Sequence, residues 1–178
     1  MIEFPKPYAD LVARLRVPSG FLIVIVFAWF SRPTIESMLW GVPVSLAGLA
    51  LRAWAAGCLA KNQQLATSGP YAYTRNPLYV GTLLVAAGLS ISARSIWLAA
   101  LFAAVFLFVY LPVIQNEEQH LRKLFPEYAA YAGRVPALLP RLGAPRPGGF
   151  RWSLYLKNQE YQAALGYVLG LILLLWRM

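Results

Sequence analysis

The residues best suited to chemistry lie in two polar stretches that border apolar segments. The first stretch, residues 63–81, reads QQLATSGPYAYTRNPLYVG. Asn76 followed by Pro77 is typical of a helix start, with Asn as the cap and Pro in the first turn. A helix N-terminus offers free N–H groups and a positive dipole end, which suit a carboxylate or phosphate. The pattern fits either a ligand-binding loop or an interfacial loop with an aromatic belt and an ordinary helix cap.

The second stretch begins at Glu117-Glu118 and continues through Tyr128, Tyr131 and Arg134. A glutamate directly after a membrane span can hold a ribose hydroxyl or an amino group, and Arg134 can hold an anionic group. The alternative is a solvated amphipathic helix whose charges pair along its own surface. The residues alone leave both interpretations open.

Three further residues have side chains that could take part in chemistry, and one of them, Arg52, is a functional candidate. Arg52 lies inside an apolar segment, where a charge is costly and needs a partner, so it is a functional candidate unless it extends to the interface. His120, the only histidine, and Cys58, the only cysteine, are expected to be a surface residue and a small buried residue. One His and one Cys give no zinc-binding pattern, and we predict no metal site.

The segments that must position these residues are apolar. Of the 178 residues, 59% are apolar and 13% are charged, whereas about a quarter of the residues in a soluble domain are charged. We therefore predict an all-α, polytopic membrane protein that forms one domain over residues 1–178. We expect an amphipathic segment at 116–131, a loop at 136–149, and about five transmembrane helices near residues 18–31, 40–60, 78–93, 95–114 and 161–176.

The basic residues support a particular orientation. The net charge is +9, but there is no long Lys/Arg run, so we predict lipid headgroups rather than nucleic acid as the partner. Five crossings would place twelve Lys and Arg residues on the side of the N-terminus and three on the other. This bias predicts a cytoplasmic N-terminus and a cytoplasmic location for both polar stretches. Gly166 and Gly170 form a small-xxx-small pair that indicates either a dimer contact or chance.

Together, the two stretches resemble the isoprenylcysteine carboxyl methyltransferase family and its bacterial relatives, which are similar to the phospholipid N-methyltransferases in this region. The resemblance spans about residues 60–142, and the last span with its lead-in, residues 150–178, lies outside it. It rests on residues 63–81, Glu117-Glu118, Leu121, Phe125, Tyr128, Tyr131, Val135-Pro136 and Pro140.

The resemblance implies a small helical membrane enzyme that binds S-adenosylmethionine from the cytosol and methylates a lipophilic or lipidated acceptor. Arg134, Glu118 and Arg52 are then the candidates for catalysis or acceptor binding. The implied cofactor contacts are Gln63, Gln64, Leu65, Ala66, Tyr71, Asn76, Pro77, Leu78, Tyr79 and Glu117.

The chain departs from the family pattern at some positions. Family members often have His at the positions of Gln63 and Asn76, and the glycine usual after Phe125 is Pro126. The prenylcysteine branch has an arginine for the substrate carboxylate where this chain has Val113. A carboxylate would then need Arg52 or Arg134, and a lipid amine becomes an equal candidate.

Two other functions fit the same pattern. Membrane sterol and steroid reductases, which bind NADPH, have a similar Arg-(His/Asn)-Pro string near the C-terminus. A non-enzymatic lipid-binding protein could also use both stretches for folding alone. The spacing of the second stretch favours the methyltransferase, and binding of the cofactor separates the three.

Overall fold

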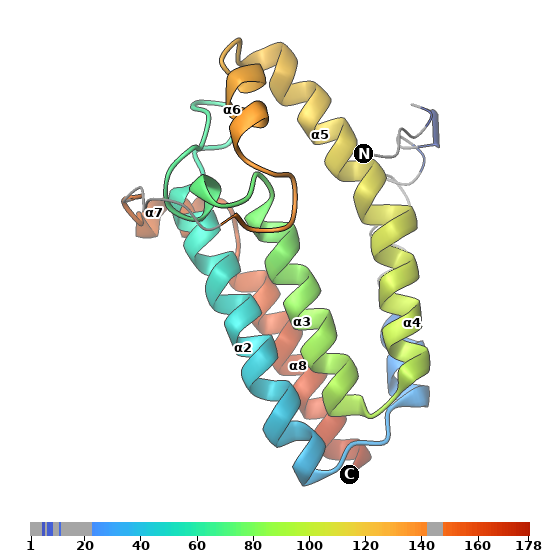
Figure 1. The fold of residues 1–178 in the computed structure, drawn as a ribbon. Helices are drawn as coiled ribbons and strands as arrows, with labels where there is room; N and C mark the ends of the chain where they lie inside the picture. The colour runs from blue at the N-terminus through green and yellow to red at the C-terminus, as the bar shows by residue number, and fades with distance from the viewer. Residues whose placement is uncertain (1–4, 6, 9–10, 12–22, 142–147) are drawn as a thin grey trace. The chain divides into compact units, whose positions relative to one another are not determined.

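Helices make up the architecture (Figure 1). The computed structural model describes residues 5, 7–8, 11, 23–141 and 148–178, and every regular element in these ranges is helical, which confirms the all-α prediction. The chain forms two compact units, one of Met1–Ser45, Ala86–His120 and Leu169–Met178 and one of Leu46–Val85 and Leu121–Val168. The helices are residues 23–30, α2 (Ile35–Cys58), α3 (Pro77–Ala93), α4 (Ile96–Val105), α5 (Leu111–Leu124), α6 (Tyr128–Arg134), α7 (Trp152–Lys157) and α8 (Tyr161–Arg177).

Among the described residues, two helical runs are long and apolar enough to cross a membrane: α2, with 24 residues, and Ile96–Leu124, with 29. They support a membrane protein. The helices α3 and α8 have 17 residues each, which is short of the roughly 20 residues that span a bilayer. The first predicted span, 18–31, falls partly outside the described residues. The count of five crossings and the cytoplasmic orientation therefore stay predictions.

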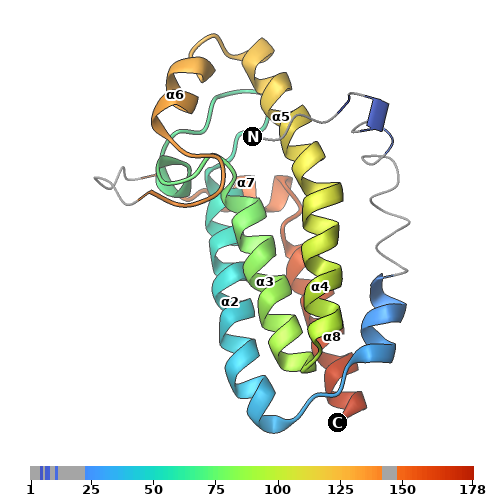
Figure 2. The same cartoon turned by 45° about the vertical axis from the view of Figure 1, so that its right-hand side comes forward.

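The second of these runs is one continuous helix rather than a span followed by a separate amphipathic segment (Figure 2). It passes from α4 through a π-helical turn, Phe106–Tyr110, into α5, and it ends at Leu124. Pro112 has no N–H for the carbonyl of Phe108, four residues earlier, and the hydroxyl of Tyr8 donates to that carbonyl at 2.7 Å. Pro112 is therefore accommodated by a π turn within an unbroken helix.

Small residues let α2 and α3 approach closely within each unit. In the first unit, a Cβ added to Gly88 would lie 2.5 Å from the carbonyl oxygen of Gly41. In the second unit, a Cβ added to Gly81 would lie 2.7 Å from the carbonyl oxygen of Gly48. Real Cβ atoms avoid such distances, so glycine is required at these crossings.

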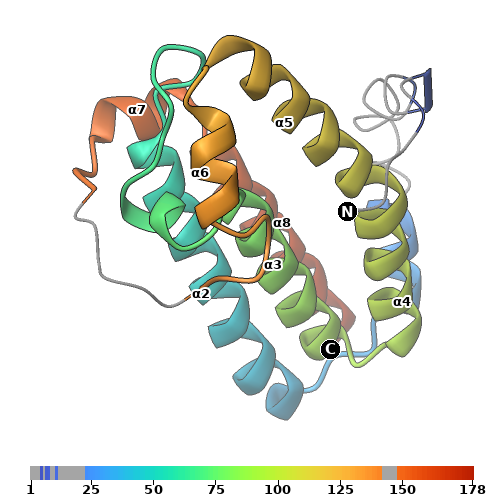
Figure 3. The ribbon, with the colours of Figure 1, turned by 45° about the horizontal axis from the view of Figure 1, so that its top comes forward.

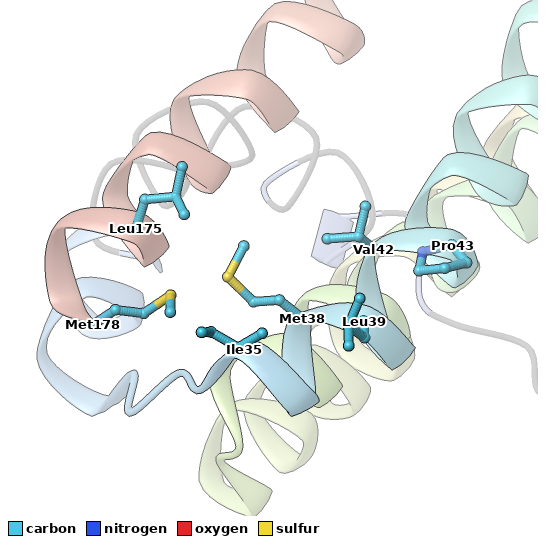
Figure 4. Close-up of a pocket in the computed structure, with 7 residues that line it drawn as sticks. All are labelled: Ile35, Met38, Leu39, Val42, Pro43, Leu175 and Met178. Atoms are coloured by element: carbon cyan, nitrogen blue, oxygen red, sulfur yellow. The ribbon is translucent and has the colours of Figure 1, made fainter.

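An apolar cluster fills the first unit, around Phe27, Ala93, Leu98 and Leu174. In the same unit, a shallow pocket lies between the start of α2 and the end of α8 (Figure 4). None of the predicted site residues lines it. Its lining is entirely apolar: Ile35, Met38, Leu39, Val42, Pro43, Leu175 and Met178.

Candidate functional site

The candidate site is built on the loop between α2 and α3 and on the segment that starts with α6, both in the second unit. After α2 ends at Cys58, the chain turns at Asn62, which has φ +59°. The backbone N–H groups of Gln63 and Gln64 both donate to the carbonyl of Ala60. A short 3₁₀ turn, Gly69–Ala72, then leads to the start of α3. The loop is therefore organised by its own backbone.

Arg75 joins this loop to α6. Its Nη1 donates to the carbonyl oxygens of Ala132 at 2.8 Å and Val135 at 3.0 Å, and its backbone N–H donates to Pro136 at 2.9 Å. These acceptors include carbonyls at the C-terminal end of α6, which lack partners within the helix. A cation at this end of a helix also complements the helix dipole. Arg75 thus acts as a side-chain cap for α6.

The neighbours of Arg75 extend the same junction. The hydroxyl of Thr74 and the side-chain amide of Asn76 both donate to the carbonyl of Ala137 at 3.0 Å. The backbone N–H of Arg141 donates to the carbonyl of Tyr73 at 3.0 Å. Thr74 and Asn76 are buried. The Thr-Arg-Asn string therefore holds the two polar stretches of the sequence together.

The helix α6 runs beside the loop (Figure 3), and an aromatic cluster joins the two. Leu65, Tyr128 and Tyr131 form its buried centre. The two tyrosine rings meet edge to face with centroids 5.9 Å apart, and the Tyr131 hydroxyl donates to the carbonyl of Tyr71 at 2.8 Å. The Arg122 guanidinium lies 5.5 Å from the centre of the Tyr128 ring. Leu65 and Tyr71, two of the implied cofactor contacts, are buried here.

The amides of Gln63 and Gln64 have a different environment. Both side chains are exposed, and neither makes a hydrogen bond to the described residues. Their donors and acceptors are therefore available to a ligand. Ala66, which follows the buried Leu65, is half-buried.

The start of α3 has fewer unbonded backbone N–H groups than the sequence suggests. Pro77 brings no N–H, and Tyr79 and Val80 donate their N–H groups to the carbonyl of Asn76 at 3.0 and 3.1 Å. Of these first-turn residues, Leu78 alone has an N–H without an acceptor in the described part of the chain. The helix end can thus give a ligand one backbone donor rather than a set of three.

The two glutamates lie on α5, in the first unit. Glu117 is exposed, whereas Glu118 is only 4% exposed. Adjacent helix residues point about 100° apart, so one carboxylate faces outward and the next faces inward. Arg134, at the end of α6, is exposed, and its Nε donates to the carbonyl of Ala130 in its own helix at 3.2 Å. Its terminal guanidinium nitrogens make no hydrogen bond to the described residues.

Arg52 has the partner that a charge in an apolar helix requires. Its Nε and Nη2 donate to the two carboxylate oxygens of Glu160 at 2.6 and 3.1 Å. Its Nη1 donates to the Thr82 hydroxyl and to the Leu78 carbonyl at 3.4 Å. The side chains of Arg52 and Glu160 are 21% and 9% exposed. This fork joins α2, α3 and the residue before α8, so most of its donors are already used.

Sequence reasoning missed Arg75 and Glu160. The signal for Arg75 was its place in the Thr-Arg-Asn string, which we took only as part of a family motif. The signal for Glu160 was stronger, since it is the only acidic residue after Glu127 and stands directly before the last apolar segment. A single buried arginine and a single nearby carboxylate are expected to pair.

Comparison with known proteins shows the family of this chain. The model of the phospholipid methyltransferase family matches residues 37–128, more than half of the chain. This match includes the loop, both glutamates and the first residue of α6. No solved structure matches the chain.

Three curated proteins are similar to the chain. The cobalt-zinc-cadmium resistance protein CzcN of Cupriavidus metallidurans is 36% identical, over 76% of this chain and 62% of its own length. The nickel-cobalt-cadmium resistance protein NccN of Alcaligenes xylosoxydans is 38% identical, over 79% and 72%. The protein-S-isoprenylcysteine O-methyltransferase of Schizosaccharomyces pombe is 29% identical, over 76% and 59%. The chain thus covers less than two thirds of two of these relatives. The match to the family model establishes that this chain belongs to the phospholipid methyltransferase family.

Proposed function

We propose that the chain is an integral membrane methyltransferase that uses S-adenosylmethionine and acts on a lipophilic acceptor at the cytoplasmic face. The junction between the loop and the α6 segment is the observation that carries this proposal. At least seven hydrogen bonds join residues 71–76 to residues 131–141. They leave the preceding amides, Gln63 and Gln64, exposed beside an ordered wall of tyrosine and leucine side chains.

The donor set of this loop fits a zwitterionic ligand with a flat ring. Two free side-chain amides can each donate to and accept from a purine edge or a ribose hydroxyl. The Leu78 N–H can donate to a carboxylate. The resemblance to the methyltransferases adds Glu117, whose exposed carboxylate on α5 can accept from an ammonium or a hydroxyl. S-adenosylmethionine has all of these groups, and when bound it supplies a methyl group on a sulfonium. We assign Leu65, Ala66, Tyr71, Asn76, Pro77 and Tyr79 to shaping the site rather than to hydrogen bonding with the cofactor.

The protein's part in the reaction is positioning. Methyl transfer is an in-line displacement, so the chain must align the acceptor and exclude water. For an amine acceptor, the buried carboxylate of Glu118 is our candidate for taking the proton that the nitrogen loses. For a carboxylate acceptor no base is needed, and the free guanidinium nitrogens of Arg134 are our candidate for binding it.

We favour a lipid amine as the acceptor. Val113 stands where the prenylcysteine methyltransferases, which this chain resembles, have an arginine. Arg52, another candidate for binding a carboxylate, already donates to Glu160. The family model that matches the chain is that of the phospholipid methyltransferases. An amine that enters from the bilayer needs no fixed cation in the site.

A methyl-transfer assay tests this proposal. The purified full chain is incubated with methyl-tritiated S-adenosylmethionine and, separately, phosphatidylethanolamine or a farnesylated cysteine analogue. We expect label in the phosphatidylethanolamine product, with a fall of about 5- to 20-fold for Gln64→Ala when S-adenosylmethionine is below saturation. Gln119→Ala, an exposed amide on α5 outside the loop, is the matched control and should keep full activity. Label in the cysteine analogue alone would reverse the choice of acceptor, and label in neither would reject the proposal.

A second candidate function is a role in resistance to divalent metal ions, favoured by the names of two relatives. In the described ranges no three or more His, Cys, Asp or Glu side chains gather as a metal site. We therefore propose that such a role would act through the methylated product. Growth on cadmium or cobalt salts of a host expressing the chain or Gln64→Ala tests it: protection lost in the variant supports the link, and equal protection argues against it.

A further inference from the structure

An aromatic and basic surface lies just before α8, outside the residues matched by the family model. Phe150, Trp152 and Tyr155 form a compact group in which the last two rings are stacked, with centroids 4.8 Å apart and planes 17° apart. Phe150 lies 6.0 Å from the ring of Trp152 and 6.4 Å from that of Tyr155. Trp152 is 62% exposed. An exposed group of three aromatic rings indicates a surface that contacts a membrane or another protein.

The group is fixed to the last turn of α2. The Phe150 ring lies against Gly57, where any Cβ would overlap it. The backbone N–H of Arg151 donates to the Gly57 carbonyl at 2.9 Å. At the other end of α7, the Asn158 amide donates to the carbonyls of Ala56 and Leu59, both at 2.9 Å. These bonds also satisfy carbonyls that the end of a helix leaves open.

This attachment sets the depth of the surface in a bilayer. The helix α2 is long and apolar enough to cross a membrane, and α7 is held at the end of it. The surface therefore lies where α2 leaves the hydrocarbon. Trp and Tyr are enriched at that level because their rings are apolar and their N–H and O–H groups need water.

Its charge matches one kind of headgroup. Residues 150–157 carry the exposed cations Arg151 and Lys157 and no acidic residue, and the nearest carboxylate along the chain, Glu160, is paired with Arg52. The apolar side also includes the exposed Leu156. We propose that residues 150–157 are an interfacial anchor, in which the rings enter the headgroup–acyl boundary and the two cations bind anionic phospholipid headgroups.

Spin labelling measures the depth of this anchor. The full chain carries Cys58→Ser and one new cysteine, Leu156→Cys, and is reconstituted in nanodiscs that contain phosphatidylglycerol. Two control sites give the accessibilities expected in water and in lipid. Glu127→Cys, at the exposed turn between α5 and α6, represents water, and Leu165→Cys, on the exposed face of α8, represents lipid. The relative accessibility to oxygen and to a water-soluble nickel complex should place residue 156 between the two controls. Accessibility equal to that at 127 would overturn the proposal and indicate a protein-docking surface, and accessibility equal to that at 165 would overturn the interfacial placement.

The ratio of anionic to zwitterionic lipid bound to the protein tests whether the two cations bind anionic headgroups. Native mass spectrometry of the protein in mixed phosphatidylglycerol and phosphatidylcholine gives the ratio of the two bound lipids. We expect Arg151→Gln/Lys157→Gln to lower that ratio by about fivefold per charge removed. Lys123→Gln/Arg177→Gln removes the same charge from exposed sites elsewhere and should change the ratio much less. Equal ratios for the two double variants, each with the circular dichroism of the wild type, would refute headgroup binding at α7.

Discussion

The ion pair between Arg52 and Glu160 gives the sharpest prediction about what holds the second unit together. Replacing Arg52 with Met leaves the carboxylate of Glu160, which is only 9% exposed, without its two donors at 2.6 and 3.1 Å. Breaking a buried pair by removing one partner costs about 3–5 kcal/mol. The Arg52 side chain is 21% exposed, so water screens part of the pair. We therefore expect the loss in the free energy of unfolding to be somewhat smaller, about 2–4 kcal/mol.

The assay is thermal unfolding in detergent, followed by circular dichroism. For a chain of this size each kcal/mol shifts the midpoint by about 2–4 °C, so Arg52→Met should lower it by roughly 4–16 °C. The double variant Arg52→Met/Glu160→Leu should lose less than the sum of the single changes, because no uncompensated charge remains. The Thr82 hydroxyl keeps its bond to the Leu78 carbonyl, at 2.9 Å, in every variant. Arg32→Gln, an exposed arginine, is the control and should leave the midpoint within about 1–2 °C.

The competing interpretation is that Arg52 binds the acceptor. In that case Arg52→Met would abolish methyl transfer while the midpoint stayed at the wild-type value, and Glu160→Leu would not share the defect. That combination would refute the structural role. Our account instead predicts that any loss of activity follows the loss of stability and is partly restored in the double variant.

Three further predictions concern the loop and the helix contacts. Arg75→Gln removes the side-chain cap of α6 and should lower the free energy of unfolding by about 2 kcal/mol, measured by thermal unfolding together with faster amide exchange in α6. Gly88→Ala should destabilise by about 1–3 kcal/mol because its Cβ meets the backbone of α2, whereas Gly166→Ala, which has open space, should be neutral or stabilising by up to about 1 kcal/mol; the same melts compare them. Gln63→Ala and Gln64→Ala should each weaken the binding of S-adenosylmethionine by about 5- to 20-fold without changing the melting midpoint, since both amides are exposed and make no hydrogen bond to the described residues.

The sequence was a good guide to the long helices. The apolar runs at 78–93 and 161–176 correspond closely to α3 and α8, because their ends carry strong local signals. Asn76-Pro77 marks the start of α3 and the charged Arg94 follows its end. The extent of α5 was not predictable in this way. Its amphipathic pattern continues directly from the apolar span, so nothing local separates the two before Pro126 disfavours helix at the residue preceding it.

The site was only partly predictable. The sequence predicted that the loop and the α6 segment form a site, but it could not tell which polar side chains hold the fold and which make no hydrogen bond to the described residues. Asn76 proves to be buried and bonded to the α6 segment, whereas Gln64 is exposed and without a partner in the described part of the chain. The difference depends on tertiary contacts about sixty residues apart, as in the bond from Asn76 to Ala137. Local propensity contains no information on such contacts.

Calorimetric titration of the detergent-purified full chain with S-adenosylmethionine, S-adenosylhomocysteine and NADPH tests the central claim most directly. Our account predicts that the first two bind and NADPH does not. It also predicts that Glu117→Ala weakens S-adenosylmethionine by about 10- to 100-fold, the range for a hydrogen bond to a charged group. Binding of NADPH alone by protein with wild-type circular dichroism would contradict the account and support a reductase. Binding of none of the three would instead support a protein without this enzymatic activity.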